Sequence, residues 1–405
     1  MFARTAAPEP PLRGELLDVA RLQDLARALA ARLTPHAASP TKRALERLRS
    51  NDRRLSETHR LLADDARRKG FVGPAGEWIL DNYHLVDAEV RALGQDLPWR
   101  FYKRLPVTRD DGVVSTRVEI LARALVSHSD SRLDRAQMAA FLDAFQTSEP
   151  LTLGELWAWP SLVRLVLLEN LRRLADSVLA ARDARQQADT YLDHLADAAF
   201  QAPRWPDGTA EVAFVSQLVR RLRDEGPRQE ALQAALDARL DGTGRTTDAV
   251  VRDDHQQQAA AQVLVANVIT SLRVCATLDW PAFVESVSVV DHALRRDPAG
   301  AYALMDFQSR DAQRKAVESL APFEGRGQVR AAHAAVECGA RTGAGAGARE
   351  AHVGYYLVGP GRPVLERTLG VRPALRRRVE RALRRRAGLV YFRRSGPPRC
   401  CRWRC

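Results

Sequence analysis

Leucine recurs at helical spacing near the start of the chain, at Leu22, Leu25, Leu29 and Leu33. Side chains three or four residues apart share one face of an α-helix, so this spacing predicts an amphipathic helix. Similar blocks follow along most of the chain and are rich in alanine, leucine and arginine, which are good helix formers. We find no strong alternation of apolar and polar residues of the kind that indicates a strand. We therefore expect an all-α fold, a multi-helix array or bundle.

Local signals place the ends of several helices. Thr152 and Glu155 have the spacing of a capping box and predict a helix start. Pro160 lies just inside that helix and predicts a kink or the end of its first segment, after which the helix continues through Leu162 to about Arg185. Farther along, Asp297 followed by proline predicts a capped helix that begins at Pro298 and continues to about residue 320.

Two other stretches give fewer helical signals. Residues 96–112 contain Pro98, Pro106 and Gly112, and we expect them to be irregular. The longest apolar run, Leu165–Leu168, is stopped by charged residues on both sides. A membrane-spanning helix needs about 18 or more mostly apolar residues, so we expect none within this chain.

The positive charge of the chain is concentrated at its end. The formal net charge is +12, and residues 371–405 contain thirteen arginines and a single acidic residue, Glu380. The other 370 residues are therefore electrically balanced, which argues against a phosphate-binding surface over the whole protein. We expect no nucleic-acid partner; binding by the tail alone is the alternative, and it predicts affinity that falls steeply with salt.

One helix face gathers groups that could carry chemistry. At 100° per residue, Glu77, Asp81 and His84 fall within about 80° of one another on a helix that spans about residues 75–93. Two carboxylates and an imidazole could perform acid–base catalysis or bind a metal. The simpler interpretation is a solvated or salt-bridged helix face, which we favour. The five cysteines form no Cys-x-x-Cys pair, so we predict no metal site.

Several short motifs together resemble one protein family. Two of them, Gly-Glu-Trp-Ile-Leu-Asp-Asn-Tyr-His-Leu-Val at 76–86 and Pro-Leu-Thr-Leu-Gly-Glu-Leu-Trp at 150–157, are the most distinctive. Further matching blocks lie at 96–98, 102–106, 169–175, 279–287, 305–311 and 352–357, in collinear order. The set resembles the N-terminal cytosolic region of cyclic β-1,2-glucan synthases, which are large bacterial membrane enzymes. The family-motif residues are Trp78, Asn82, Tyr83, Glu155, Trp157, Glu169, Asn170, Asp306, Arg310, His352 and Tyr355.

The resemblance implies a non-catalytic role for this chain. Such synthases build their glucan from a UDP-glucose donor with a divalent metal, and their catalytic regions would lie beyond Cys405. We therefore carry no catalytic residue over and expect no cofactor on this chain. The implied partner is the rest of the synthase polypeptide or its transferase domain, at the cytoplasmic face of the bacterial inner membrane. The alternative is a sugar-binding module or small enzyme that uses Glu77, Asp81 and His84.

The resemblance also suggests how the chain is divided. Residues 321–350 lack the family pattern between two matching flanks and are rich in glycine and alanine, so we interpret them as an irregular, low-complexity and possibly frame-shifted segment. After Phe392 the family would enter membrane helices, whereas this chain continues with arginine, glycine and cysteine, and we interpret it as truncated. The predicted segments are an N-terminal helix and linker at 1–40, a helical domain at 41–320, the irregular segment at 321–350, a helical segment before a lost membrane span at 351–392, and a basic disordered tail at 393–405.

Overall fold

The computed structural model describes residues 9–36, 40–68, 70–110, 113–194, 209–223, 236–237, 240, 244–341 and 349–371. Almost all regular structure in these ranges is helical, which confirms the predicted all-α fold. The chain separates into two compact units, Met1–Ser288 and Val289–Cys405. The five segments predicted from the sequence remain a prediction, and the basic tail from residue 372 onward lies outside the described residues.

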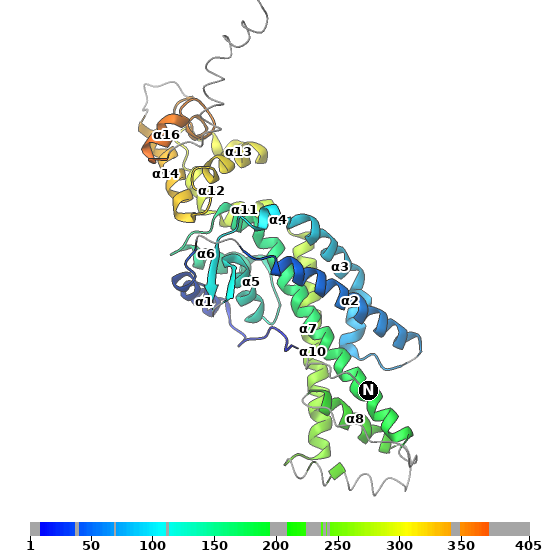
Figure 1. The fold of residues 1–405 in the computed structure, drawn as a ribbon. Coiled ribbons are helices and arrows are strands. Elements are labelled where there is room, and N and C mark those ends of the chain that lie inside the picture. The colour runs from blue at the N-terminus through cyan, green and yellow to red at the C-terminus, as the bar shows by residue number, and fades with distance from the viewer. Residues whose placement is uncertain are drawn as a thin grey trace, which may run out of the picture. The chain divides into compact units, whose positions relative to one another are not determined.

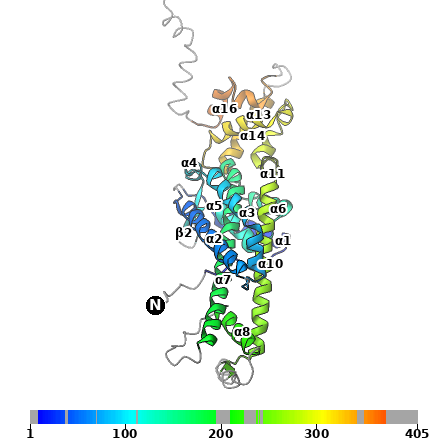
Figure 2. The same ribbon diagram turned by 90° about the vertical axis from the view of Figure 1, so that its right-hand side faces the viewer.

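The first unit is built around one long helix, α7 (Leu153–Asp193), against which α2, α3, α5, α8 and α10 all pack (Figure 1). In a view turned by 90°, α7 and α10 run side by side and α8 packs against both (Figure 2). The other elements of this unit are α1 (Val19–Arg32), α2 (Arg43–Arg67), α3 (Pro74–Asp96), α4 (Trp99–Tyr102), β1 (Val107–Asp110), β2 (Val113–Thr116), α5 (Arg117–Ser127), α6 (Arg135–Gln146), α8 (Thr209–Arg223), α10 (Thr247–Thr277) and α11 (Trp280–Val287).

The start of α7 follows the sequence signal. Thr152 accepts a hydrogen bond from the backbone N–H of Glu155, and the Glu155 carboxylate accepts one from the backbone N–H of Thr152, so the predicted capping box is confirmed. Pro160 lies inside the helix, which continues through it, as predicted, and extends beyond the predicted end near Arg185 to Asp193. Pro160 and its neighbours Trp159 and Leu162 are buried, and tertiary packing of this kind can offset the hydrogen bond that proline removes.

The core of the first unit is one continuous apolar cluster. It contains the fully buried Trp159 together with leucines and valines from nearly every helix. Burying one such leucine stabilises the fold by about 1.5–3 kcal/mol. A second cluster joins the C-terminal half of α7 to α8 and the start of α10, with Phe214 fully buried.

A β-hairpin begins in the segment 96–112, which the sequence predicts to be irregular. Strands β1 and β2 pair antiparallel, with Val107 opposite Thr116. The prediction is therefore wrong over β1 and over α4, whereas β2 follows the predicted segment. The dipeptide Asp111-Gly112 is a typical hairpin-turn signal, but its flanking strands have only four residues each, which is too short for a clear alternating pattern.

By length and composition, α10 is one described helix that could cross a membrane. It packs against α3, α7 and α8, and Val265, Val268, Ile269 and Leu272 are buried in the core. A core helix passes the same test of length and composition, so this feature alone is a weak indication of a membrane span.

The second unit is a small helical array. Its elements are α12 (Val289–Leu294), the 3-10 helix η2 (Tyr302–Leu304), α13 (Phe307–Glu318), α14 (Gly325–Arg341), α15 (Val353–Leu357) and α16 (Arg362–Thr368). The helix predicted to begin at Pro298 is wrong: α13 begins later and is capped by Asp306, whose side chain accepts from the backbone N–H of Ser309 at 2.7 Å.

Helix α14 occupies much of the segment that was predicted to be irregular. Ala331, Ala332 and Ala335 are buried along one side of it. Alanine has the highest intrinsic helix propensity, and its small side chain allows close helix packing, so a composition that resembles low complexity is compatible with an ordered helix here. Residues 342–348, which carry most of the Gly-Ala repeat, lie outside the described residues.

Candidate functional site

The three residues of the predicted polar face lie together on α3. Glu77, Asp81 and His84 are all exposed, whereas Ile79 and Val86 on the opposite side are buried in the core. The described part of the chain contains no group of three or more histidine, cysteine or acidic residues that could hold a metal ion. Whether this face binds a ligand remains a prediction.

The family-motif residues beside this face join α3 to neighbouring helices. Asn82 is buried; its amide donates to the carbonyl of Trp78 at 2.9 Å and accepts a hydrogen bond from Arg273 of α10. The ring of Tyr83 stacks on His59 of α2, with centroids 4.0 Å apart and planes at 13°. These contacts give the motif a packing role that does not depend on a ligand.

Glu155 and Glu169 project from α7 toward different arginines, Glu155 toward Arg117 and Glu169 toward a cluster of three. The Glu155 carboxylate forms a bidentate ion pair with Arg117, with Nε–Oε1 at 2.9 Å and Nη2–Oε2 at 2.7 Å. Trp157, on the same helix, packs against the main core. The next motif residue, Asn170, is fully buried: its amide donates to Ser131 Oγ at 2.8 Å, and its oxygen accepts from the backbone N–H of Leu12 at 2.6 Å.

Glu169 is the centre of the arginine cluster. Arg123 donates to both of its oxygens, at 3.0 and 2.9 Å, and Arg173 donates to Oε1 at 2.8 Å. Arg47 lies 3.8 Å from the same carboxylate. Burial alone would raise the pKa of Glu169, but the hydrogen bonds and charges of Arg123, Arg47 and Arg173 outweigh it and lower the pKa to about 2. The carboxylate is therefore ionised throughout the physiological range.

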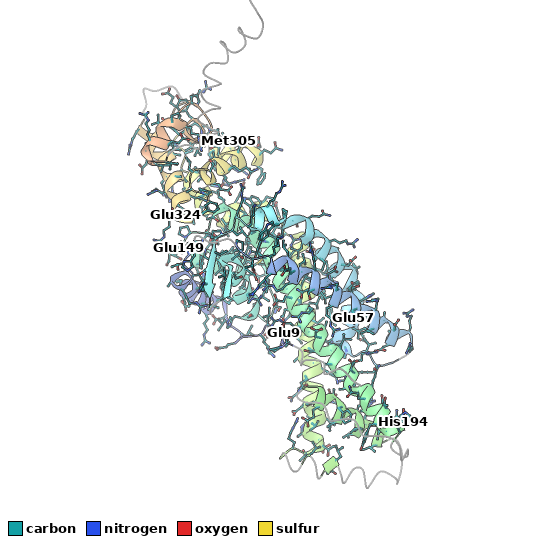
Figure 3. All side chains as sticks on the ribbon, in the orientation of Figure 1. Glu9, Glu57, Glu149, His194, Met305 and Glu324 are labelled. Atoms are coloured by element: carbon teal, nitrogen blue, oxygen red, sulfur yellow. The ribbon has the colours of Figure 1, made fainter. Side chains whose placement is uncertain are left out.

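A polar cavity of about 620 Å³ opens beside this cluster. Glu9, from the segment before α1, reaches its rim and pairs with Arg172 at 2.5 Å and Arg173 at 3.4 Å. Figure 3 marks Glu9 alongside α7. The hydrogen bond from Arg172 is the main cause of a lowered Glu9 pKa. The cavity is lined by Glu9, Arg47, Ser50, Asn51, Ser115, Glu119, Ile120, Arg123, Glu169, Arg172 and Arg173.

A second cavity, of about 480 Å³, is mostly apolar and is called the apolar groove below. Its lining includes Phe71 and Val72, which precede α3, and Ala261 and Leu264 of α10. Phe71 is 49% exposed, and its ring lies under Arg185 and Arg220 at 5.1 and 5.7 Å.

The motif residues of the second unit cap and brace short helices. Asp306 caps α13, and Arg310 donates to the carbonyl of Met305. His352 caps α15 through Nδ1, which accepts from the backbone N–H of Gly354 at 2.7 Å. The hydroxyl of Tyr355 lies 3.5 Å from Glu350.

Sequence reasoning identified Glu169 but missed the arginines around it. Arg47, Arg123 and Arg173 come from α2, α5 and α7, and no spacing within one helix relates all three. An arginine four residues after Glu169 was the only local signal, and such pairs are common on helix surfaces.

Most of the chain matches part of one known protein. The chain is 32% identical over 366 residues to a cyclic β-(1,2)-glucan synthase of Rhizobium meliloti (strain 1021). The match covers 87% of this chain and 13% of that protein, so the chain spans about an eighth of the length of the curated relative. No family model matches the chain.

Proposed function

From its homology, over most of its own length, to a segment of a cyclic β-1,2-glucan synthase, we propose a role for the chain. It is a non-catalytic helical region that docks on or regulates the transferase part of such an enzyme. The UDP-glucose donor and the divalent metal that the resemblance implies would bind elsewhere in the synthase. We place the region at the cytoplasmic face of the inner membrane, again as a proposal from the resemblance.

The burial of two motif carboxylates and their pairing with arginines support this role. Glu155 and Glu169 are 0% and 3% exposed, and arginines engage both oxygens of each. A general acid or nucleophile must reach its substrate, whereas these groups hold helices together. We propose that the motif blocks around these two carboxylates serve folding.

The apolar groove is the surface that we propose for docking. Exposed apolar surface on a folded domain commonly marks an interface. The matched relative is far longer than the matched region, so additional synthase polypeptide is available to cover the groove. We therefore propose the rest of the synthase as its partner.

The test is to express the region and the remainder of a cyclic β-1,2-glucan synthase as separate polypeptides. We expect the two to copurify, and we expect glucan formation from UDP-glucose to require the remainder and to rise when the region is added. Phe71→Ser should weaken copurification, whereas the control Val263→Ser should not, because Val263 is 57% exposed on α10 but does not line the groove. Glucan formation by the region alone would overturn the proposal.

A further inference from the structure

The polar cavity beside Glu169 contains hydrogen-bond donors that lack acceptors. Asn51 of α2 lines the cavity, is 3% exposed, and its amide nitrogen has no hydrogen-bond partner among the described residues. Nε of Arg47 and Nε of Arg173 are also buried and make no hydrogen bond, although each lies within 4 Å of a carboxylate oxygen. A buried donor left without an acceptor costs about 1–3 kcal/mol, so three around one cavity require an explanation.

The carboxylates already present in the cavity wall are all engaged. Four arginines and three glutamates line it. The pairings are Glu119 with Arg47 and Tyr102, Glu169 with Arg123 and Arg173, and Glu9 with Arg172. Among these arginines and glutamates, the groups that still lack a partner are therefore donors. The lining also carries a net positive charge, because it has four arginines and three glutamates. A ligand that completes this site must be rich in acceptors and negatively charged.

Glu9 differs from the other two glutamates. Its side chain is 60% exposed, whereas those of Glu119 and Glu169 are 3% and 4% exposed. It also belongs to a segment outside any helix, so it can leave the cavity without disturbing one. Its carboxylate occupies the guanidinium groups of Arg172 and Arg173 in the way that an anionic ligand would.

We propose that this cavity binds the oxyanion of a phosphate or phosphoryl group, which Arg47, Asn51 and Arg173 hold, and that Glu9 competes with it for the arginines. The planar guanidinium group matches the geometry of phosphate oxygens. A cavity of about 620 Å³ exceeds the size of a phosphate group, so it also accommodates a group attached to the phosphate. The oxyanion is either free phosphate or part of a nucleotide.

Isothermal titration calorimetry of the full chain at constant ionic strength tests this proposal. Sodium phosphate and uridine diphosphate are titrated in parallel, and we expect saturable binding. Similar affinities identify free phosphate as the ligand, whereas binding at least about tenfold tighter for the diphosphate identifies a nucleotide.

Asn51→Leu separates binding from folding. Leucine has the same number and branching of side-chain heavy atoms and is a better helix former, and the asparagine amide nitrogen has no partner to lose, so the variant should unfold at the same or a higher temperature than the wild type. It should nevertheless bind phosphate more weakly by about tenfold or more, the effect of one hydrogen bond to a charged group. As a control on the same helix, Arg67→Gln removes an exposed positive charge far along α2 and should leave binding unchanged.

Glu9→Gln should change the affinity for phosphate in the opposite direction. Removing the competing charge should tighten phosphate binding by roughly two- to fivefold, the range for a partly exposed charge pair. Its control is Glu57→Gln, which removes an exposed carboxylate paired with Arg54 outside the cavity. Absence of saturable binding for both ligands, or equal affinities for the wild type, Asn51→Leu and Glu9→Gln, would overturn the proposal. Either result leaves the docking proposal intact, because that proposal depends on a different surface.

Discussion

Arg117 and Glu155 form a buried, bidentate ion pair that fixes the start of α5 against the start of α7. Their side chains are 1% and 0% exposed, and two hydrogen bonds of 2.9 and 2.7 Å join them. The same carboxylate closes the capping box of α7, since it also accepts from the backbone N–H of Thr152 at 2.8 Å. The Glu155 side chain therefore caps the start of α7 and also binds the start of α5 through Arg117.

Glu155→Gln should destabilise the fold strongly. The substitution removes the negative charge and leaves the Arg117 guanidinium buried, with Glu149 at 3.3 Å as its remaining carboxylate partner. Removing one partner of a buried pair costs about 3–5 kcal/mol. The free energy of unfolding, measured by urea denaturation with far-ultraviolet circular dichroism, should fall by that amount.

Two further variants test whether the loss of stability comes from the buried ion pair and not from the removal of any nearby charge. Glu149→Gln should cost about 1 kcal/mol or less, because that carboxylate lies farther from Arg117 than the Glu155 carboxylate does, at 3.3 Å, and is partly exposed. The double variant Arg117→Met with Glu155→Leu should be more stable than Glu155→Gln, since it leaves no unpaired buried charge. A double variant less stable than the single one would show that the hydrogen bonds outweigh the burial of charge.

Glu169 should make the stability of the chain depend on acidic pH. Folding lowers its pKa from 4.5 to about 2, so the ionised carboxylate stabilises the folded state above about pH 4.5, and this contribution is lost as the pH falls toward 2. The depression corresponds to roughly 3 kcal/mol at neutral pH. The difference in unfolding free energy between the wild type and Glu169→Gln should therefore be largest at neutral pH and should shrink between about pH 4.5 and pH 2.

An exposed carboxylate provides the comparison for this pH dependence. Glu57 is 48% exposed and pairs with Arg54 within one helix, so Glu57→Gln should show little difference from the wild type at any pH. A Glu169→Gln difference that stayed constant across the acidic range would mean that the arginines do not hold this carboxylate ionised.

The sequence predicted the features whose causes are local. The capping box at Thr152 and Glu155 was identified because the two side chains act within three residues of each other. The apolar stripe through Leu22 and Leu29 was identified because helix geometry relates those positions directly, and both are buried. Such features require no knowledge of where distant segments lie.

The features that were missed depend on tertiary structure. Arg117 and Glu155 are 38 residues apart, and nothing in either neighbourhood indicates the other. The helix predicted at Pro298 failed because the Asp297 carboxylate, which has the usual residue type of a helix cap, instead binds backbone groups of a turn and of a distant helix. The cavity beside Glu169 combines α2, α5, α7 and the segment before α1, so no single periodicity could reveal it.

Asp297→Ala should destabilise the second unit more than loss of an ordinary helix cap. The carboxylate accepts three backbone hydrogen bonds of 3.0 Å, from Ala301, Tyr302 and Val353. Tyr302 and Val353 are fully buried, so their N–H groups would be left without acceptors, at a cost of about 3 kcal/mol or more in total. Amide hydrogen exchange at Val353 reports the loss directly and should become faster.

Asp306→Ala is the matched comparison for Asp297. Asp306 is an exposed cap whose side chain bonds the start of α13, and its removal should lower the free energy of unfolding less than the removal of Asp297 does. Equal losses for the two variants would indicate that Asp297 contributes no more than a simple cap.

The exposed face of α3 provides the last prediction. Glu77→Ala combined with Asp81→Ala should change the free energy of unfolding by at most about 1 kcal/mol, because both side chains are exposed and the main loss is the favourable position of Glu77 in the first turn of the helix. In a synthase that carries this region, glucan formation should stay at the wild-type level, since our proposal assigns this face no ligand. Unchanged stability together with lost glucan binding or synthesis would instead favour the sugar-binding alternative, with His84→Ala as the next variant. The two interpretations predict the same stability but different activity for this double variant. Measuring its free energy of unfolding and its glucan formation therefore decides between them.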